Sequence, residues 1–179
     1  MMLIVLASNY LVQIPFSFLG LQNILTWGAF TYPIAFLVTD LANRVHGIEF
    51  TRRVIQIGFI WGIIVSLYFA IGEFNLIYLR FVICSGLAFL VALLLDANIF
   101  NKLRNHKHWF IPPFLSSIIS SAIDTILFFS IAFYGTQVPW ISLALGDFLV
   151  KIMIAMLMLV PFRLIVKNLN LVQNSFFSR

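Results

Sequence analysis

The feature that most constrains this fold is the absence of charge from long stretches of the sequence. Residues 1–39 contain no Asp, Glu, Lys or Arg, and residues 54–72 form a second uncharged stretch. About 20 apolar residues cross the roughly 30 Å hydrocarbon core of a bilayer as a helix, which satisfies its own backbone hydrogen bonds. Because 62% of the chain is apolar and only 9% is charged, a soluble domain of this size is excluded. The sequence predicts an all-α integral membrane protein.

Polar or turn-forming segments divide the chain into six candidate membrane helices, which form a single domain over residues 1–179. The sequence becomes apolar directly after Met1, without the basic segment of a signal peptide, so we interpret its start as the first span. Gly28 and Pro33 are expected to bend or break the short second span. The predicted spans are residues 2–19, 24–39, 54–72, 79–100, 109–133 and 140–165.

The basic residues predict which helix ends face the cytoplasm, because short cytoplasmic loops carry an excess of Lys and Arg. Arg80 alone lies in the loops predicted for the opposite side. Both termini are therefore expected in the cytoplasm. This topology also explains the net charge of +5, so the lipid bilayer is an expected partner and a nucleic acid is not. Nine basic residues fall on the predicted cytoplasmic side: Arg44, Arg52, Arg53, Lys102, Arg104, Lys107, Arg163, Lys167 and Arg179.

Several ionisable residues lie inside the predicted spans, where a charged side chain costs about 2.5–3.5 kcal/mol on insertion scales and usually faces a cavity or a partner. Asp124 lies near the middle of the fifth span, and Asp96 lies in the cytoplasmic third of the fourth. These adjacent helices could present both carboxylates to one cavity. We interpret Asp124 as a binding residue, with a structural hydrogen bond between helices as the alternative. For Asp96 the alternative is contact with water or with basic loop residues.

Two further acidic positions have simple structural explanations. Asp147 and Lys151 are four residues apart in the sixth span, so they share one face of that helix. They are candidates for a binding site, and mutual neutralisation is the alternative. Asp40 lies at the end of the second span near Arg44. From the residues alone, Asp40 is interpreted as a helix-end or loop-pairing residue.

Uncharged polar residues in the first two spans are further candidates for ligand contacts. Asn9 and Gln13 share a helix face, so they could hydrogen bond across a cavity or to another helix. Thr26 and Trp27 precede Gly28, where a broken helix would expose backbone groups to a ligand. The fifth span carries a stripe of small polar residues that we interpret as helix packing: Ser116, Ser117, Ser120 and Ser121.

Enzymatic and metal sites find little support in the sequence. Gly146 and Asp147 match half of the Gly-x-Gly-Asp signature of intramembrane aspartyl proteases, but residue 144 is alanine. The three His residues lie in predicted loops without the helical spacing of metal ligands. Cys84 is the single cysteine, so it forms no intrachain disulfide. We predict a transporter that is not an enzyme and has no cofactor; a non-transporting membrane subunit is the alternative of a different class.

Five segments beginning at residues 7, 25, 93, 121 and 146 are distributed over most of the chain's length. In order they read ASNYLVQIPFSFLG, LTWGAFTYPIAFLVTDLANRVHG, LLLDANIFNKLR, SAIDTILFFSIAF and GDFLVKI. This ordered series closely resembles the bacterial queuosine precursor transporters of the vitamin uptake (VUT) family.

The resemblance implies a six-helix protein of the bacterial inner membrane, similar in fold to the substrate-binding S components of energy-coupling factor transporters. It also implies import of 7-deazaguanine precursors for queuosine in tRNA, such as 7-cyano- and 7-aminomethyl-7-deazaguanine. Such a base is flat and presents adjacent N–H donors, which one carboxylate can accept together while aromatic rings cover its faces. The family pattern matches at Gly28 and at the expected substrate-binding residues Asn9, Gln13, Thr26, Trp27, Asp40, Asp96, Asp124 and Lys151.

Within this expected site, Asp124 or Asp96 reads the guanine-like edge, Asn9 and Gln13 read the remaining groups, and Trp27 or a Phe stacks on the ring. Another purine- or vitamin-like solute is the alternative substrate. Energy coupling stays open among a proton on one of the two carboxyls, facilitated diffusion with intracellular trapping, and a separate energising partner. The chain itself contains no ATP-binding segment. The sequence predicts no particular oligomeric state.

Overall fold

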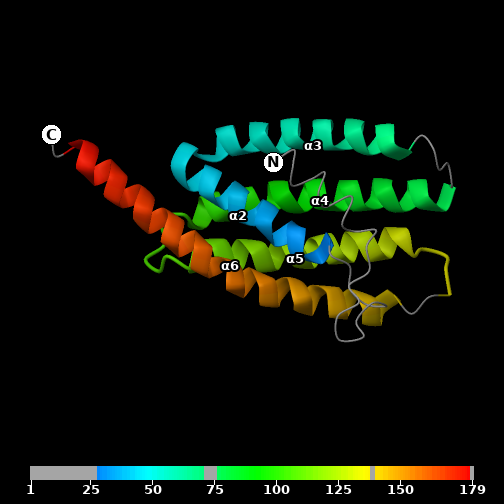
Figure 1. The fold of residues 1–179 in the computed structure, drawn as a ribbon. Coiled ribbons are helices and arrows are strands. Elements are labelled where there is room, and N and C mark those ends of the chain that lie inside the picture. Colours follow the sequence, from blue (N-terminus) through cyan, green and yellow to red (C-terminus); the bar gives the residue numbers. More distant parts are fainter. Residues whose placement is uncertain (1–27, 71–75, 138–139, 178–179) are drawn as a thin grey trace.

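The computed structural model describes residues 28–70, 76–137 and 140–177, and it describes side chains within residues 33–64, 83–137 and 140–168. Five helices make up most of these ranges, and each overlaps one of the second to sixth predicted spans (Figure 1). The helices matching the second and sixth spans end at residues 46 and 177 rather than at 39 and 165. The first predicted span, residues 2–19, lies outside the described residues. The helices are α2 (Gly28–His46), α3 (Ile48–Ala70), α4 (Leu76–Leu103), α5 (Ile111–Ala132) and α6 (Trp140–Phe177).

Three helical segments in the described part of the chain are long and apolar enough to cross a membrane. They are Ile83–Leu103, Ile111–Ala132 and Trp140–Asn168. The outer surface of α6 is strongly apolar, and Leu149 on that surface is 64% exposed. Water would not favour such a surface, but lipid does, because in a bilayer apolar side chains face the hydrocarbon. The chain is therefore an all-α, multi-pass membrane protein.

Helix α4 packs against α2, α3 and α5, and α2 contacts all four other described helices (Figure 1). Helix α6 packs against α5 and α2. Small side chains let the backbones approach closely, as in many membrane helix interfaces: Ala92 and Ala97 of α4 and Ala35 of α2 are all fully buried. Ile55 of α3 packs into the same core cluster. This packing fixes one face of α4 against one face of α2, where the candidate site lies.

The connection between α2 and α3 is much tighter than the sequence indicates. The charged segment of residues 40–53 is predicted as a break, but α2 continues to His46 and α3 begins at Ile48. Gly47 alone turns the chain, with φ of +83°, a left-handed conformation that glycine adopts without steric cost. Its N–H donates to the carbonyl oxygen of Asn43 over 3.0 Å. Polar residues at a helix end therefore stay helical here, because the end reaches a polar environment.

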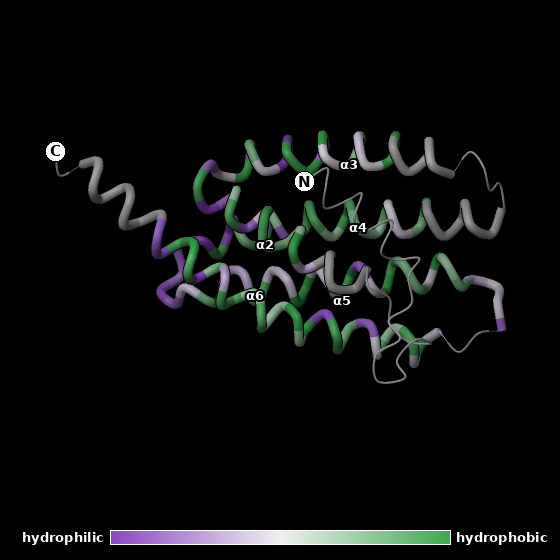
Figure 2. The backbone as a smooth tube through the Cα atoms, viewed as in Figure 1, coloured by the Kyte–Doolittle hydropathy of each residue, from purple (hydrophilic) through white to green (hydrophobic). Residues whose placement is uncertain are grey.

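The basic residues near the α2–α3 and α4–α5 connections lie close together at one end of the molecule. Arg44 donates from Nη1 to the carbonyl oxygen of Arg104, and Arg104 donates from Nη2 to the carbonyl oxygen of Arg44. The Arg163 guanidinium lies 4.8 Å from the ring centroid of Trp109. Figure 2 shows hydrophilic residues gathered at this end, where α2 turns into α3 and α4 is followed by α5. This arrangement agrees with the prediction that these basic segments share one side, although it does not assign that side to the cytoplasm.

Candidate functional site

Two of the predicted site residues, Asp40 and Asp96, meet between α2 and α4. Asp40 is 2% exposed and Asp96 is fully buried. The Asp96 carboxyl faces the side chains of Asp40 and Thr39 on α2 and of Ser116 on α5. The alternative interpretation, in which Asp40 pairs with Arg44, is not observed, because the Arg44 guanidinium binds the Arg104 carbonyl instead. Two acidic side chains thus share one buried position.

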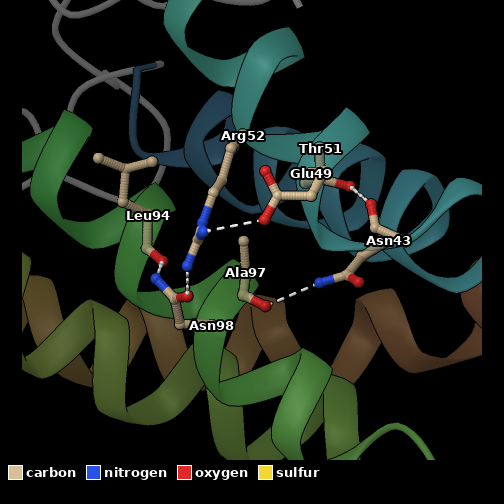
Figure 3. Close-up of polar contacts among 8 residues, drawn as sticks. Asn43, Glu49, Thr51, Arg52, Leu94, Ala97 and Asn98 are labelled. Atoms are coloured by element: carbon tan, nitrogen blue, oxygen red, sulfur yellow. Dashed lines mark hydrogen bonds and ion pairs between the residues drawn. The ribbon is translucent and has the colours of Figure 1, made fainter.

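Hydrogen bonds next to this carboxyl pair hold α2, α3 and α4 in register. Asn43, fully buried on α2, donates from Nδ2 to the carbonyl oxygen of Ala97 over 2.7 Å (Figure 3). On α3, Arg52 donates from Nη2 to Oδ1 of Asn98 over 2.6 Å and from Nη1 to Oε1 of Glu49 over 3.2 Å. Since Ala97 and Asn98 directly follow Asp96, the Asn43 bond links α2, and the Arg52–Asn98 bond links α3, to the backbone next to Asp96. The Arg52–Glu49 contact stays within the exposed first turn of α3.

Three of the four oxygens of the two carboxyls lack a hydrogen-bond partner among the described residues. Neither oxygen of Asp96, nor Oδ1 of Asp40, has a hydrogen-bond partner there. Thr39 donates its hydroxyl proton to the carbonyl oxygen of Phe36 over 2.9 Å, and Ser116 donates its own to the carbonyl oxygen of Pro113 over 3.3 Å. Both hydroxyls also lie close to the Asp96 carboxyl, so each stands between that carboxyl and a backbone carbonyl. Buried polar groups are normally paired, so unpaired carboxyls at this depth are better suited to a function than to stability.

A second charged cluster joins α5 to α6 through Lys151. Its Nζ lies 2.8 Å from Oδ2 of Asp124 and 2.5 Å from Oδ2 of Asp147, and it donates to Oγ1 of Thr125 over 3.1 Å. Thr125 in turn donates to Oδ2 of Asp147 over 2.8 Å. The side chains of Asp124 and Lys151 are each 7% exposed. The predicted pairing of Asp147 with Lys151 is observed, and Asp124 joins it, which the sequence did not indicate.

Asp96 and Asp124 do not form the facing pair that the sequence suggested. Asp96 is at the level of Ser116, and Asp124 lies eight positions further along α5, which is about 12 Å at 1.5 Å per residue. Asp96 instead faces Asp40, and Asp124 is neutralised by Lys151. The sequence correctly placed the two carboxylates on adjacent helices. Residues on adjacent helices are in contact only if they lie at the same level along the helix axes.

A cleft connects the two clusters. It is formed by α2, α5 and α6, and the space in it that a water molecule can reach is about 20 Å³. Asp40 and Lys151 line the same cleft, together with the aromatic rings of Phe36 and Phe162. The serine stripe of α5 is buried, as expected for helix packing. However, two of its members, Ser117 and Ser121, also line the cleft.

Four predicted site residues lie outside the described residues: Asn9, Gln13, Thr26 and Trp27. Their contribution to the cleft remains a prediction. Conversely, the sequence analysis did not select Asn43, Asn98 and Thr125, which position or pair with the acidic residues. The available signal was spacing, because Asn43 follows Asp40 by three residues and so lies on a neighbouring part of the same helix face.

Comparison with known proteins places the chain in a family. Residues 26–166 match the family described as "Putative vitamin uptake transporter". The chain is 34% identical to the queuosine precursor transporter of Escherichia coli (strain K12) over 178 residues, which cover 89% of this chain and 80% of that protein. It is 37% identical to the "Probable queuosine precursor transporter" of Haemophilus influenzae over 186 residues, which cover 88% and 79%. No solved structure matches significantly. This family consists of transporters rather than enzymes, and the chain belongs to it.

Proposed function

We propose that this protein imports queuosine precursors across the bacterial inner membrane, with 7-cyano-7-deazaguanine and 7-aminomethyl-7-deazaguanine as substrates. The observation that carries the proposal is a buried carboxyl pair, three of whose four oxygens have no hydrogen-bond partner among the described residues and one member of which lines a cleft. The two relatives named as queuosine precursor transporters support the choice of substrate. A small flat molecule with hydrogen-bond donors would satisfy the carboxyl oxygens that have no partner in the described part of the chain.

The chemistry of the cleft suits a guanine-like base. Asp40 lines the cleft and Asp96 lies buried behind it; when the helices move apart enough to admit a base, the pair would supply acceptors for the adjacent N–H groups that distinguish it from an adenine-like ring. Phe36 and Phe162 line the same cleft and are placed to cover the faces of a flat ring. Asp124 is the weaker candidate for reading the edge, because Lys151 already occupies its Oδ2.

Lys151 and its two carboxylates are proposed to shape the other end of the substrate site. The cluster holds one ammonium against two carboxylates, so its net charge is −1 when all three groups are ionised. Lys151 lines the cleft, and a substrate that approaches it meets donors fixed by two ion pairs rather than a mobile side chain. Rigid placement of this kind lowers the entropy cost of binding.

The proposed architecture is a bundle of six membrane helices with both termini in the cytoplasm. The five helices of the described part and the basic residues gathered at one end support it. In this arrangement the carboxyl pair lies nearer the cytoplasmic end, and the Lys151 cluster lies deeper in the membrane. A fold like that of the S components of energy-coupling factor transporters is part of the same proposal. A carrier of another purine- or vitamin-like solute is the alternative.

Restored queuosine in tRNA tests the proposal. In bacteria that neither make nor import the precursors, expression of this chain with limiting 7-cyano-7-deazaguanine is expected to restore queuosine, measured in hydrolysed tRNA by mass spectrometry. Asp40→Ala is expected to abolish the restoration, because it removes an acceptor that lines the cleft. Glu49→Ala is the matched control, since that carboxylate is 76% exposed and lies away from the cleft.

The outcome depends only on protein that reaches the membrane, so the amount of inserted protein is measured in the same cells. Inserted wild-type protein that restores no queuosine with either precursor contradicts the proposal. If it instead restores growth on a different purine or vitamin, the alternative substrate class is correct.

A further inference from the structure

We propose that Asp40 and Asp96 hold one shared proton and that this proton is bound together with the substrate. The inference rests on the proposed function and deepens it, because it names a second species bound at the same site. A shared proton would link substrate binding to the pH on each side of the membrane. The proposal stands on the geometry of the pair and on the groups that surround it.

The charged groups near the pair are already committed elsewhere in the described part of the chain. From α6, Lys151 lines the same cleft but lies against Asp124 and Asp147. From α3, Arg52 binds Glu49 and Asn98. Neither of these cations therefore neutralises the carboxyl pair.

The uncharged side chains near the pair do not balance its charge either. From α2 and α5, the hydroxyls of Thr39 and Ser116 donate to backbone carbonyls. Ser120, one turn after Ser116, is fully buried, and its hydroxyl has no hydrogen-bond partner among the described residues. Among the described residues, no group that faces the pair therefore carries a positive charge that would balance it.

Two facing carboxyls in a buried position cannot easily both be ionised, because the charges repel each other and are poorly solvated. A proton in such a pair belongs to both groups rather than to one of them. This proton is a donor that Asp40 and Asp96 themselves bring to the site. The singly protonated pair thus offers one O–H donor beside carboxylate acceptors.

That combination is complementary to the edge of a guanine-like base, where a carbonyl acceptor lies next to N–H donors. The shared O–H can donate to the carbonyl oxygen while the ionised carboxylate accepts the N–H groups. A doubly ionised pair would place a negative oxygen against that carbonyl oxygen, and a doubly protonated pair would lose its charged acceptor. Substrate and proton therefore bind cooperatively at this pair.

The test measures binding of 7-cyano-7-deazaguanine, which carries no amine, to the purified full-length protein between pH 6 and 8.5. The wild-type affinity is expected to be highest at low pH and to weaken as pH rises, by up to about tenfold per pH unit where the pair has lost its proton. The sign follows because the form that binds substrate is the protonated one. Glu49→Gln is the matched control and keeps the wild-type profile, because Glu49 is exposed and outside the cleft.

Asparagine provides the decisive comparison, because its amide carries a permanent N–H donor in place of the shared O–H. Asp40→Asn and Asp96→Asn each leave one carboxylate, so at least one of them is expected to bind at every pH with the affinity that the wild type has at low pH. A wild-type profile that does not change with pH, a wild-type profile in both variants, or loss of binding by both variants overturns the inference.

A second measurement needs no variant. In weakly buffered solution near pH 8.5, binding of the neutral precursor to the wild type is expected to take up a proton, approaching one per bound molecule, detected with a pH indicator. Binding without proton uptake overturns the inference but leaves the proposed function intact. In contrast, a wild type that binds no precursor at any pH and restores no queuosine in cells contradicts the proposed function itself.

Discussion

Replacing Lys151 by methionine is expected to destabilise the protein by about 3–5 kcal/mol, because the change leaves buried carboxylates without their cation. Lys151 contacts both Asp124 and Asp147, and its side chain is 7% exposed. Methionine fills a similar volume, so the loss reflects charge rather than packing. The free energy of unfolding in mixed detergent micelles measures the effect.

Two comparisons separate the charge effect from a general sensitivity of α6. Adding Asp124→Asn and Asp147→Asn to Lys151→Met removes the uncompensated charges, so most of the lost stability is expected to return. Lys102→Met, which removes an exposed ammonium at the basic end, is expected to change stability little. If the single Lys151→Met variant were as stable as the wild type, the ion pairs of Lys151 would not contribute to stability.

Replacing Asp96 by alanine is expected to have the opposite signature, with binding lost and stability kept. A hydrogen bond to a charged group contributes about 1.5–3 kcal/mol, so losing two such bonds to the substrate weakens binding by about 3 kcal/mol or more. That corresponds to at least about a 100-fold increase in Kd. Because neither Asp96 oxygen has a partner among the described residues, alanine removes no hydrogen bond seen there. Precursor binding and unfolding are measured on the same purified sample.

The contrast between the two acidic positions makes this result informative. Asp124→Ala leaves Lys151 paired with Asp147 alone, and it is expected to cost stability that Asp96→Ala does not. Glu49→Ala, an exposed acidic position, is expected to change neither quantity. Unchanged precursor affinity in a folded Asp96→Ala protein would remove Asp96 from the substrate site.

Patterns within one helix predicted much of this structure. Apolar stretches indicated where the five described helices lie, and three of these helices contain segments long and apolar enough to cross the hydrocarbon core. Spacing of four residues placed Asp147 and Lys151 on one face of α6, and their ion pair is observed. The family resemblance identified Asp40 as a site residue where local reasoning assigned it to a loop contact, and the structure buries it.

Contacts between helices could not be predicted in the same way. Asp40 and Asp96 are 56 positions apart, and nothing in their local sequences indicates which faces of α2 and α4 meet. That choice depends on the small residues between the helices and on bonds such as that from Asn43 to Ala97. The same reason explains why Lys151 was paired only with Asp147, its neighbour on the same helix, and not also with Asp124 on α5.

Uptake by purified protein in liposomes tests the central claim most directly, because it involves no other cellular component. The protein is reconstituted, and entry of radiolabelled 7-cyano-7-deazaguanine is followed over time. The account predicts saturable uptake that unlabelled 7-aminomethyl-7-deazaguanine inhibits, that adenine does not inhibit, and that Asp96→Ala abolishes. Uptake no greater than in protein-free liposomes, by wild-type protein shown to be folded and reconstituted, would contradict it.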